Sequence, residues 1–207
     1  MNIILHWLSA NYIELIAAIL GLLGVWLTAK QYIWCWPVGL VNVLLSGYVF
    51  FTARLYADVV LQVFYLVMTI YGWYYWVFGG KKKYELPVRR IRKKELIFML
   101  IIGMVGSATV GFIFYKFTNA AYPFWDSLLM VWGIIGTYAM AKKILEHWIM
   151  WIIIDLNCTA LYFFKGLYAF TPQYFIFTLL AVYGYYEWIK DYKKSQARLN
   201  DIAGQDC

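Results

Sequence analysis

Long apolar runs dominate the chain, and short charged segments separate them. A helix that crosses the roughly 30 Å hydrocarbon core of a bilayer needs about 20 mainly apolar residues. Stretches of about this size, free of Asp, Glu, Lys and Arg apart from Asp155, lie between Glu14 and Lys30, Lys30 and Arg54, Asp58 and Lys81, Glu95 and Lys116, Asp126 and Lys142, His147 and Lys165, and Lys165 and Glu187. Apolar residues before Glu14 and Asp126 lengthen the two shortest. The pattern predicts seven transmembrane segments.

The apolar runs are continuous, as in LIAAILGLLGVWLTA at 15–29. Inside lipid every backbone polar group needs a partner within the protein, so spanning segments are helices or strands of a closed barrel. Barrel strands alternate apolar and polar residues over about ten positions, which these runs do not do. We therefore predict an all-α integral membrane protein. The first segment follows no positive region or cleavage site, so we expect it to remain as a helix.

Composition agrees with a membrane protein. Of the 207 residues 64% are hydrophobic and 14% are charged, too few charges to cover a soluble globule. The predicted spans place 15 of the 18 Lys and Arg residues on the side of the C-terminus. Because Lys and Arg accumulate in cytoplasmic loops, we expect the N-terminus outside and the C-terminus inside.

The densest basic segment is KKKYELPVRRIRKK at 81–94. Basic residues next to a span set topology and attract anionic lipid headgroups, whereas a soluble basic patch would indicate nucleic acid. We interpret this segment as juxtamembrane, with membrane lipid as its partner and no nucleic acid. It also divides the chain into two halves.

Those halves repeat. A shift of 112 positions aligns the first three spans with the last three without a gap. The matched residues include Glu14 with Asp126, Gly21 with Gly133, Gly24 with Gly136, Lys30 with Lys142, Trp36 with Trp148, Leu55–Ala57 with Leu167–Ala169, and Trp76 with Trp188. We interpret the paired glycines as points of close helix packing rather than hinges.

Corresponding spans are four apart, so both copies enter the membrane in the same direction. This predicts a 3+1+3 parallel repeat: a first three-helix unit at 1–80, a basic loop and linker helix at 81–117, a second unit at 118–190, and a cytoplasmic tail at 191–207. Transporters built from repeats place their substrate near the bilayer midplane, where the repeats meet.

Polar side chains inside the spans are the candidate functional residues, because they are costly in lipid unless they face a partner or a cavity. We select as substrate-binding candidates Trp36, Asn42, Gln62, Tyr65, Trp151, Asp155, Asn157, Tyr162 and Gln173. Amide and carboxylate groups among aromatic rings suit a polar solute that carries a ring. The alternatives are a helix-to-helix hydrogen bond for Asp155 and an interfacial position for Gln173. We assign Trp73, Trp76 and Trp188 to the aromatic belt at the membrane interface.

Catalytic and metal-binding patterns are not found. Cys35, Cys158 and Cys207 have no short metal-type spacing, and His6 and His147 stand far apart. There is no paired-carboxylate, HExxH, GxSxG or Walker pattern, so we expect neither an enzyme nor a cofactor or metal. Passive, facilitated movement of a solute is the simplest mechanism.

Two segments carry a family resemblance: WPVGLVNVLLSGYVFFTARLYADVVLQVFYLVMTIYGWYYW at 36–76 and WIIIDLNCTALYFFKGLYAFTPQYFIFTLLAVYGYYEW at 151–188. They resemble the PnuC family of bacterial vitamin transporters, which is similar in architecture to the SWEET sugar transporters. By motif position, the resemblance makes Gln62, Tyr65, Trp151 and Asp155 the leading substrate contacts, followed by Asn42 and Asn157.

The resemblance implies a multi-pass protein of the bacterial inner membrane and a homotrimer. It implies uptake of nicotinamide riboside by facilitated diffusion, with phosphorylation in the cytoplasm trapping the product. Thiamine, as in the PnuT branch, or another ringed vitamin such as riboflavin is the alternative substrate. A membrane-embedded enzyme or a scaffold that does not transport is the alternative of a different class.

Overall fold

The computed structural model describes residues 12–52, 54, 56–80, 86–118, 120–164 and 171–205. These residues form α2 (Tyr12–Ala29), α3 (Cys35–Thr52), α4 (Tyr56–Phe78), α5 (Lys93–Phe117), α6 (Pro123–Ala141), α7 (His147–Phe164) and α8 (Thr171–Gln205). The first residues of the chain, the lysines at 81–83 and the predicted turn around Lys165 lie outside the described residues.

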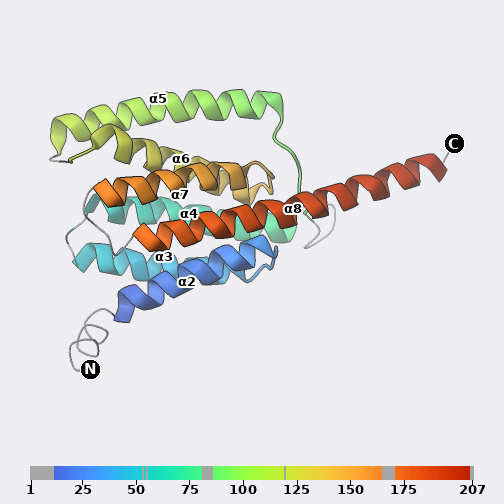
Figure 1. The fold of residues 1–207 in the computed structure, drawn as a ribbon, viewed down its shortest axis with the longest axis horizontal. Helices are drawn as coiled ribbons and strands as arrows, with labels where there is room; N and C mark the ends of the chain where they lie inside the picture. The colour runs from blue at the N-terminus through green and yellow to red at the C-terminus, as the bar shows by residue number, and fades with distance from the viewer. Residues whose placement is uncertain are drawn as a thin grey trace.

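The prediction of an all-α membrane protein is confirmed. The helices α3 to α7 each have the length and apolar composition to cross a membrane, and α2 adds a shorter apolar helix over Leu15–Ala29. In α8 an apolar first half continues without a break into a charged second half that leaves the bundle (Figure 1). The region expected as a tail from residue 191 is therefore helical as far as Gln205.

Six helices form a closed ring. α3 packs between α2 and α4, and α7 packs between α6 and α8. The two units meet where α2 contacts α8 and where α4 contacts α6, which closes the circle. Among the described helices α5 packs on α6 alone, so it lies outside the ring (Figure 1).

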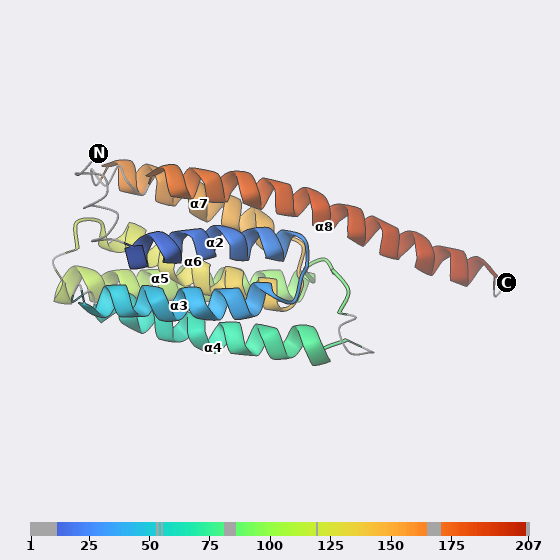
Figure 2. The ribbon, with the colours of Figure 1, turned by 90° about the horizontal axis from the view of Figure 1, so that it is seen from below.

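The units run in parallel, as the 112-residue offset predicts. α2 and α6 begin at the same end of the bundle and point the same way, while α5, which links the two units in sequence, runs in the opposite direction (Figure 2). The contact of α2 with α8 has its counterpart in that of α6 with α4. Without α5 the second unit would enter from the wrong side of the membrane.

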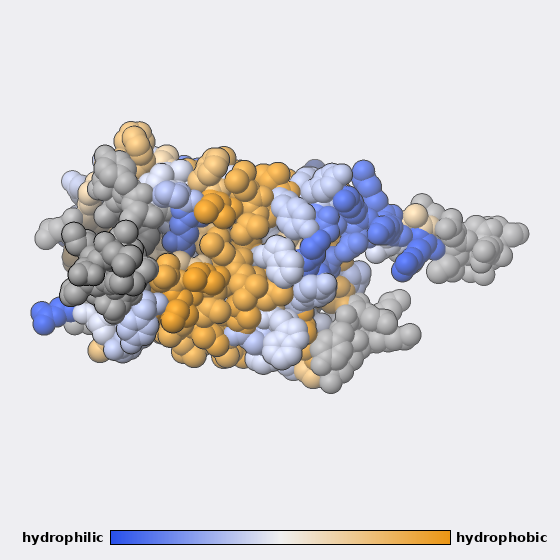
Figure 3. Space-filling view, turned by 60° about the horizontal axis from the view of Figure 1, so that its bottom comes forward, coloured by the Kyte–Doolittle hydropathy of each residue, from blue (hydrophilic) through white to orange (hydrophobic). Residues whose placement is uncertain are grey.

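The surface has a transverse apolar band. Large apolar side chains such as Phe98, Leu156 and Leu179 are exposed around the bundle. Figure 3 shows the band crossing the middle of the molecule, with hydrophilic residues gathered beyond it where α8 emerges. We call that end the basic end; it carries Lys30, Arg89, Arg90, Lys142 and Lys143.

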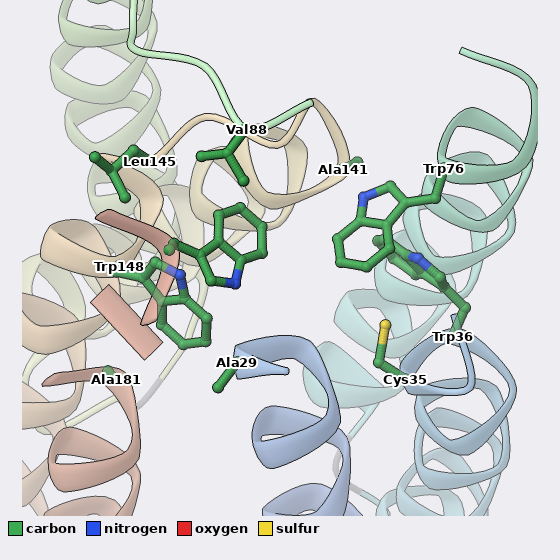
Figure 4. Packing of buried hydrophobic residues seen from close by; sticks show 10 residues of the cluster. Ala29, Cys35, Trp36, Trp76, Val88, Ala141, Leu145, Trp148 and Ala181 are labelled. Atoms are coloured by element: carbon green, nitrogen blue, oxygen red, sulfur yellow. The ribbon is translucent and has the colours of Figure 1, made fainter. Parts of the chain in front are cut away.

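Repeat symmetry extends to the aromatic core at the basic end (Figure 4). Trp36 meets Trp76 edge to face with ring centroids 5.3 Å apart, and the equivalent pair of Trp148 and Trp188 does so at 5.7 Å. Such edge-to-face pairs add about 0.5–1.5 kcal/mol to the burial of their rings. The same sequence signal in both repeats thus folds into the same local packing.

Two indoles of this core join the repeats. Trp76 donates to the Met140 carbonyl at 3.3 Å, and Trp188 donates to the Thr28 carbonyl at 3.0 Å. The assignment of these two residues to an interfacial belt is wrong, because they are 3% and 0% exposed. Their N–H groups find partners on the other repeat, so burial is favoured. Trp73, at 37% exposure, remains on the surface.

The segment before α5 is pinned to the second repeat. The Arg89 amide donates to the Lys143 carbonyl at 3.0 Å, and the Leu145 amide donates to the Arg89 carbonyl at 2.8 Å. The Arg89 guanidinium also forms a two-pronged pair with Glu95 at 2.7 and 3.0 Å. Residues 86–94 of the basic stretch therefore follow a fixed path over the α6–α7 turn.

Candidate functional site

One carboxylate lies in the middle of a helix of the ring. Asp155 stands halfway along α7 and is 5% exposed. The middle turns of α2 to α7 and the first four turns of α8 contain no other Asp or Glu and no Lys or Arg. A lone buried carboxylate at membrane depth is costly unless it meets a counter-charge or polar ligand, which makes Asp155 the leading candidate for a functional residue.

Tyr65 of the other repeat lies near this carboxylate. Tyr65 of α4 lies within electrostatic range of Asp155, Cys158 and Tyr162, all on α7. Because α4 and α7 are not packed against each other in the ring, the Tyr65 side chain reaches across its interior. The Tyr65 hydroxyl would lie 2.6 Å from a Cβ added at Gly133, so α6 provides room for it only because that residue is glycine.

α8 contributes a second aromatic wall. Tyr174 stacks on Tyr162 with ring centroids 5.0 Å apart and an interplanar angle of 21°. Phe177, one turn along, meets Tyr174 edge to face at 5.9 Å. The Phe177 ring reaches α2, 3.4 Å from the place that a Cβ on Gly21 would take. This wall runs from α7 to the first repeat.

Asn42 completes the circle from α3. Its side-chain amide donates to the Ala17 carbonyl of α2 and lies 3.5 Å from the Cβ position at Gly21. Asn42 and Phe177 therefore meet at the same glycine. All six ring helices contribute to this group, which we call the central cluster: Gly21, Asn42, Tyr65, Gly133, Asp155, Cys158, Tyr162, Tyr174 and Phe177.

Of the predicted site residues, the structure brings together Asn42, Tyr65, Asp155 and Tyr162. It places Trp36 elsewhere, in the aromatic core, where the six-membered ring lies against Gly72. Trp151 stands one turn from Asp155, with its indole 3.4 Å from the Cβ position at Gly136 and against that same core.

The remaining three predicted residues flank the central cluster. Gln62 is half-buried on α4, 3.7 Å from the Cβ position at Gly47 of α3. Asn157 donates to the Ile153 carbonyl of its own helix at 2.8 Å. Gln173 is half-buried in the first turn of α8, next to Tyr174. Their part in binding stays a prediction.

Sequence reasoning missed Tyr174 and Phe177. The repeat offset held the signal for Phe177, which is the counterpart of Tyr65: each faces the first-helix glycine of the other repeat, Gly21 or Gly133. The repeat offset gives no such signal for Tyr174, whose place in the cluster depends on its stacking contact with Tyr162.

Two carboxylates lie near the central cluster at the end opposite the basic end. Tyr162 lies within electrostatic range of Asp58 in the first turn of α4 and Asp126 in the first turn of α6. Within the described residues, no group of three His, Cys, Asp or Glu side chains could hold a metal ion. The central cluster is thus suited to a cationic, ring-bearing organic solute, since aromatic faces and the Asp155 carboxylate both attract cations.

Comparison with known proteins points to one group. The family described as nicotinamide mononucleotide transporter matches residues 11–190. The nicotinamide riboside transporter PnuC of Escherichia coli K12 is 31% identical, with 91% of this chain and 89% of the relative covered. The riboflavin/roseoflavin transporter RibM of Streptomyces davaonensis is 30% identical, with 84% and 83% covered.

A solved structure shares the fold. The crystal structure of the vitamin B3 transporter PnuC superposes with a TM-score of 0.73, covering 93% of this chain and 87% of that one. The sequence identity of that pair is 20%, so this likeness concerns the fold.

Proposed function

The chain belongs to the nicotinamide mononucleotide transporter family, and from this premise we propose that it carries nicotinamide riboside across the membrane by facilitated diffusion. It is a multi-pass protein of the bacterial inner membrane and a transporter rather than an enzyme. The observation that carries the choice of substrate is the lone carboxylate Asp155 among aromatic rings.

The charge of the central cluster favours the riboside over its phosphate ester. A pyridine ring joined to ribose through its nitrogen carries a fixed positive charge, which Asp155 neutralises and the rings of Tyr65, Tyr162 and Tyr174 stabilise. A phosphate group would meet a buried carboxylate and no Lys or Arg in the middle turns of the described helices. Moving a like charge into this setting is costly.

The relatives leave a flavin as the second candidate, because RibM matches at nearly the same identity. An isoalloxazine ring is neutral and can stack on the Tyr162 and Tyr174 wall without using Asp155. The carboxylate therefore separates the two candidates. Thiamine is not favoured by these relatives, although its ring is also cationic.

The repeat supports alternating access, in which one repeat moves against the other around a fixed site. The cross-repeat hydrogen bonds of Trp76 and Trp188 hold the basic end closed in this structure. Lys30 pairs with Glu187 at 3.2 Å, and the equivalent Lys142 lies 3.7 Å from the Tyr75 ring centre. We propose that separating these contacts opens the path toward the cytoplasm, and that the basic end faces that side. Phosphorylation of the riboside inside then prevents its return.

We further propose a homotrimer in the bilayer, in keeping with the resemblance to the PnuC family. α5 leaves one face open to lipid or to a second copy, with Phe98, Ile101 and Met104 exposed. A mass of three chains for the purified protein, measured by light scattering with the detergent mass subtracted, is the expected result; a monomer mass would contradict it.

Reconstituted vesicles test the proposed function. Labelled nicotinamide riboside should equilibrate across the membrane with saturable kinetics, without ATP or an ion gradient, and unlabelled riboside should compete. Riboflavin and nicotinamide mononucleotide serve as the comparison solutes. The absence of saturable riboside flux would overturn the proposal, and saturable flux of riboflavin alone would select the second candidate.

A further inference from the structure

A polar cavity lies at the basic end, apart from the central cluster. Its volume is about 450 Å³, within the range of small-molecule sites. It is lined by Gln31, Leu86, Pro87, Val88, Lys143, Asp191, Lys194, Ser195 and Arg198. The turn after α2, the segment before α5, the α6–α7 turn and the second half of α8 all contribute, so both repeats and the linker share this cavity.

The lining is strongly cationic. Lys143, Lys194 and Arg198 supply three positive charges against the one negative charge of Asp191. Asp191 is already engaged, because the Gln31 amide donates to its carboxylate at 2.6 Å. The cavity therefore holds a surplus of two positive charges, the complement of a doubly charged anion.

Lys143 is the least accessible of the three cations, at 7% exposure. Its ammonium donates to the side-chain Oε1 of Gln31 at 2.9 Å and lies 4.4 Å from the Trp76 ring centre. Within the described part of the chain no carboxylate lies within salt-bridge distance of it. An ammonium that is buried without a paired carboxylate is costly, and an anion in the cavity would offset that cost.

The pKa of Lys143 also indicates that its buried charge lacks a full counter-charge. Burial lowers the pKa of Lys143 to about 8, while the nearby Cys35 thiol and Asp191 carboxylate act in the opposite direction. The other charged groups that face it across the cavity are Lys194 and Arg198 on α8, which oppose its protonation. A bound anion would restore its full charge.

The cavity is also held in shape. The linker amides and carbonyls bonded to the α6–α7 turn fix the backbone on both sides of Lys143. Lys143 and its counterpart Gln31 both adopt left-handed backbone conformations, with φ of 48° and 57°. Non-glycine residues take this conformation at a cost, so the tertiary contacts determine both positions. The side chains that meet there are thereby preorganised.

We propose that this cavity binds a phosphate monoester, with the phosphate at Lys143, Lys194 and Arg198 and the organic part against Leu86, Pro87 and Val88. Charge-assisted hydrogen bonds from Lys and Arg are the usual means of phosphate recognition. Resting on the proposed function, the soluble ligand of this chemistry is nicotinamide mononucleotide, the phosphorylated form of the transported riboside. The headgroup of phosphatidic acid presents the same chemistry from the bilayer.

Calorimetry on the full-length protein in neutral detergent tests the proposal, with nicotinamide mononucleotide, inorganic phosphate and nicotinamide riboside as titrants. The double variant K194Q/R198Q removes two exposed charges of α8 and should weaken mononucleotide binding roughly tenfold or more. Lys193→Gln is the matched control, because Lys193 is exposed on the same helix and does not line the cavity. Its affinity should stay within about twofold of the parent protein.

Nanodiscs separate the two sources of the phosphate. In phosphatidylcholine discs, mononucleotide binding that the double variant weakens identifies a soluble ligand. If only discs with added phosphatidic acid show an interaction, seen as a thermal shift lost in the double variant, the lipid headgroup is the ligand. The proposal would be overturned if neither the mononucleotide nor phosphatidic acid bound, or if K194Q/R198Q left their binding unchanged. Riboside binding retained in the double variant would show that the central cluster is intact, whatever happens at this cavity.

Discussion

At the scale of single residues, the proposed recognition of a cationic ring depends on Asp155. It is buried, it stands in the middle of α7, and Tyr65 from the other repeat faces it. A helix-to-helix hydrogen bond was the alternative role for this side chain. A cation bound beside this buried carboxylate and the nearby Tyr65 would offset the cost of burying the charge.

Asp155→Asn keeps the shape of the side chain and removes its charge. We expect affinity for nicotinamide riboside to fall at least tenfold, because the cationic ring loses its counter-charge in a low-dielectric setting. Titration calorimetry on the purified protein measures this. Thr109→Val is the control, since Thr109 is exposed on α5 and bonds only its own helix. An unchanged affinity in Asp155→Asn would mean that the binding site lies elsewhere.

Tyr174 tests a residue that only the structure revealed. In Tyr174→Leu the stacked partner of Tyr162 is lost while apolar volume is largely kept. Stacking contributes about 0.5–1.5 kcal/mol, so riboside affinity should fall roughly 2- to 10-fold. Tyr115→Leu on the exposed face of α5 is the matched control and should bind as the parent does. Equal affinities in the two variants would remove Tyr174 from the site.

At the scale of helices, close approach depends on equivalent glycines. The Trp36 ring occupies the space beside Gly72, and the Trp148 ring would lie 2.5 Å from a Cβ on Gly184. Nothing in a hydropathy pattern reveals this requirement, yet it fixes the distance between α3 and α4 and between α7 and α8. The sequence pairs Trp36 with Trp148 and Gly72 with Gly184 at the same offset of 112.

Gly72→Ala and Gly184→Ala should each destabilise the protein by about 1–3 kcal/mol, because the added methyl forces a buried indole to move. Gly24→Ala is the control: its Cβ would meet Val38 at 3.9 Å, an ordinary contact. Thermal unfolding in detergent, followed by tryptophan fluorescence, should show a lower midpoint for the first two variants alone. A midpoint for Gly72→Ala equal to that of Gly24→Ala would contradict the packing assigned to Trp36.

At the scale of the whole molecule, the repeats are joined at the basic end by two indole hydrogen bonds and by Lys143 with Gln31. Gln31 and Lys143 are equivalent positions of the two repeats and contact each other, so the pseudo-symmetry axis passes between them. Motion of one repeat against the other must separate these contacts first. We therefore regard this junction as the inner gate.

The double variant W76F/W188F removes the two indole hydrogen bonds between the repeats and keeps aromatic packing. We expect the gate to open more often, so that the buried thiol of Cys35 reacts several-fold faster with N-ethylmaleimide. The assay uses a background with Cys158→Ala and Cys207→Ala, so that Cys35 is the reactive thiol. Trp73→Phe is the control, since Trp73 is exposed on α4. Equal labelling rates in both variants would show that these bonds do not hold the gate.

The sequence by itself determined the elements and their order. Span length, charge asymmetry and the 112-residue offset predicted seven helices in a 3+1+3 parallel arrangement, because membrane thickness and backbone hydrogen bonding act locally along the chain. The same reasoning selected Asn42, Tyr65, Asp155 and Tyr162, since polar groups inside spans are few. It wrongly placed Trp76 and Trp188 at the membrane interface, because the sequence around a tryptophan at a helix end does not show whether the ring is interfacial or buried.

Only the tertiary structure decided which residues meet. The closure of six helices into a ring brings Tyr65 to Asp155 and Phe177 to Gly21, pairs that stand 90 and 156 positions apart in sequence. It also assembles the cationic cavity from four segments, none of which is distinctive alone. Periodicity states which face of a helix is polar; the packing of distant helices decides what that face touches, and here it joins Asp155 to its aromatic walls.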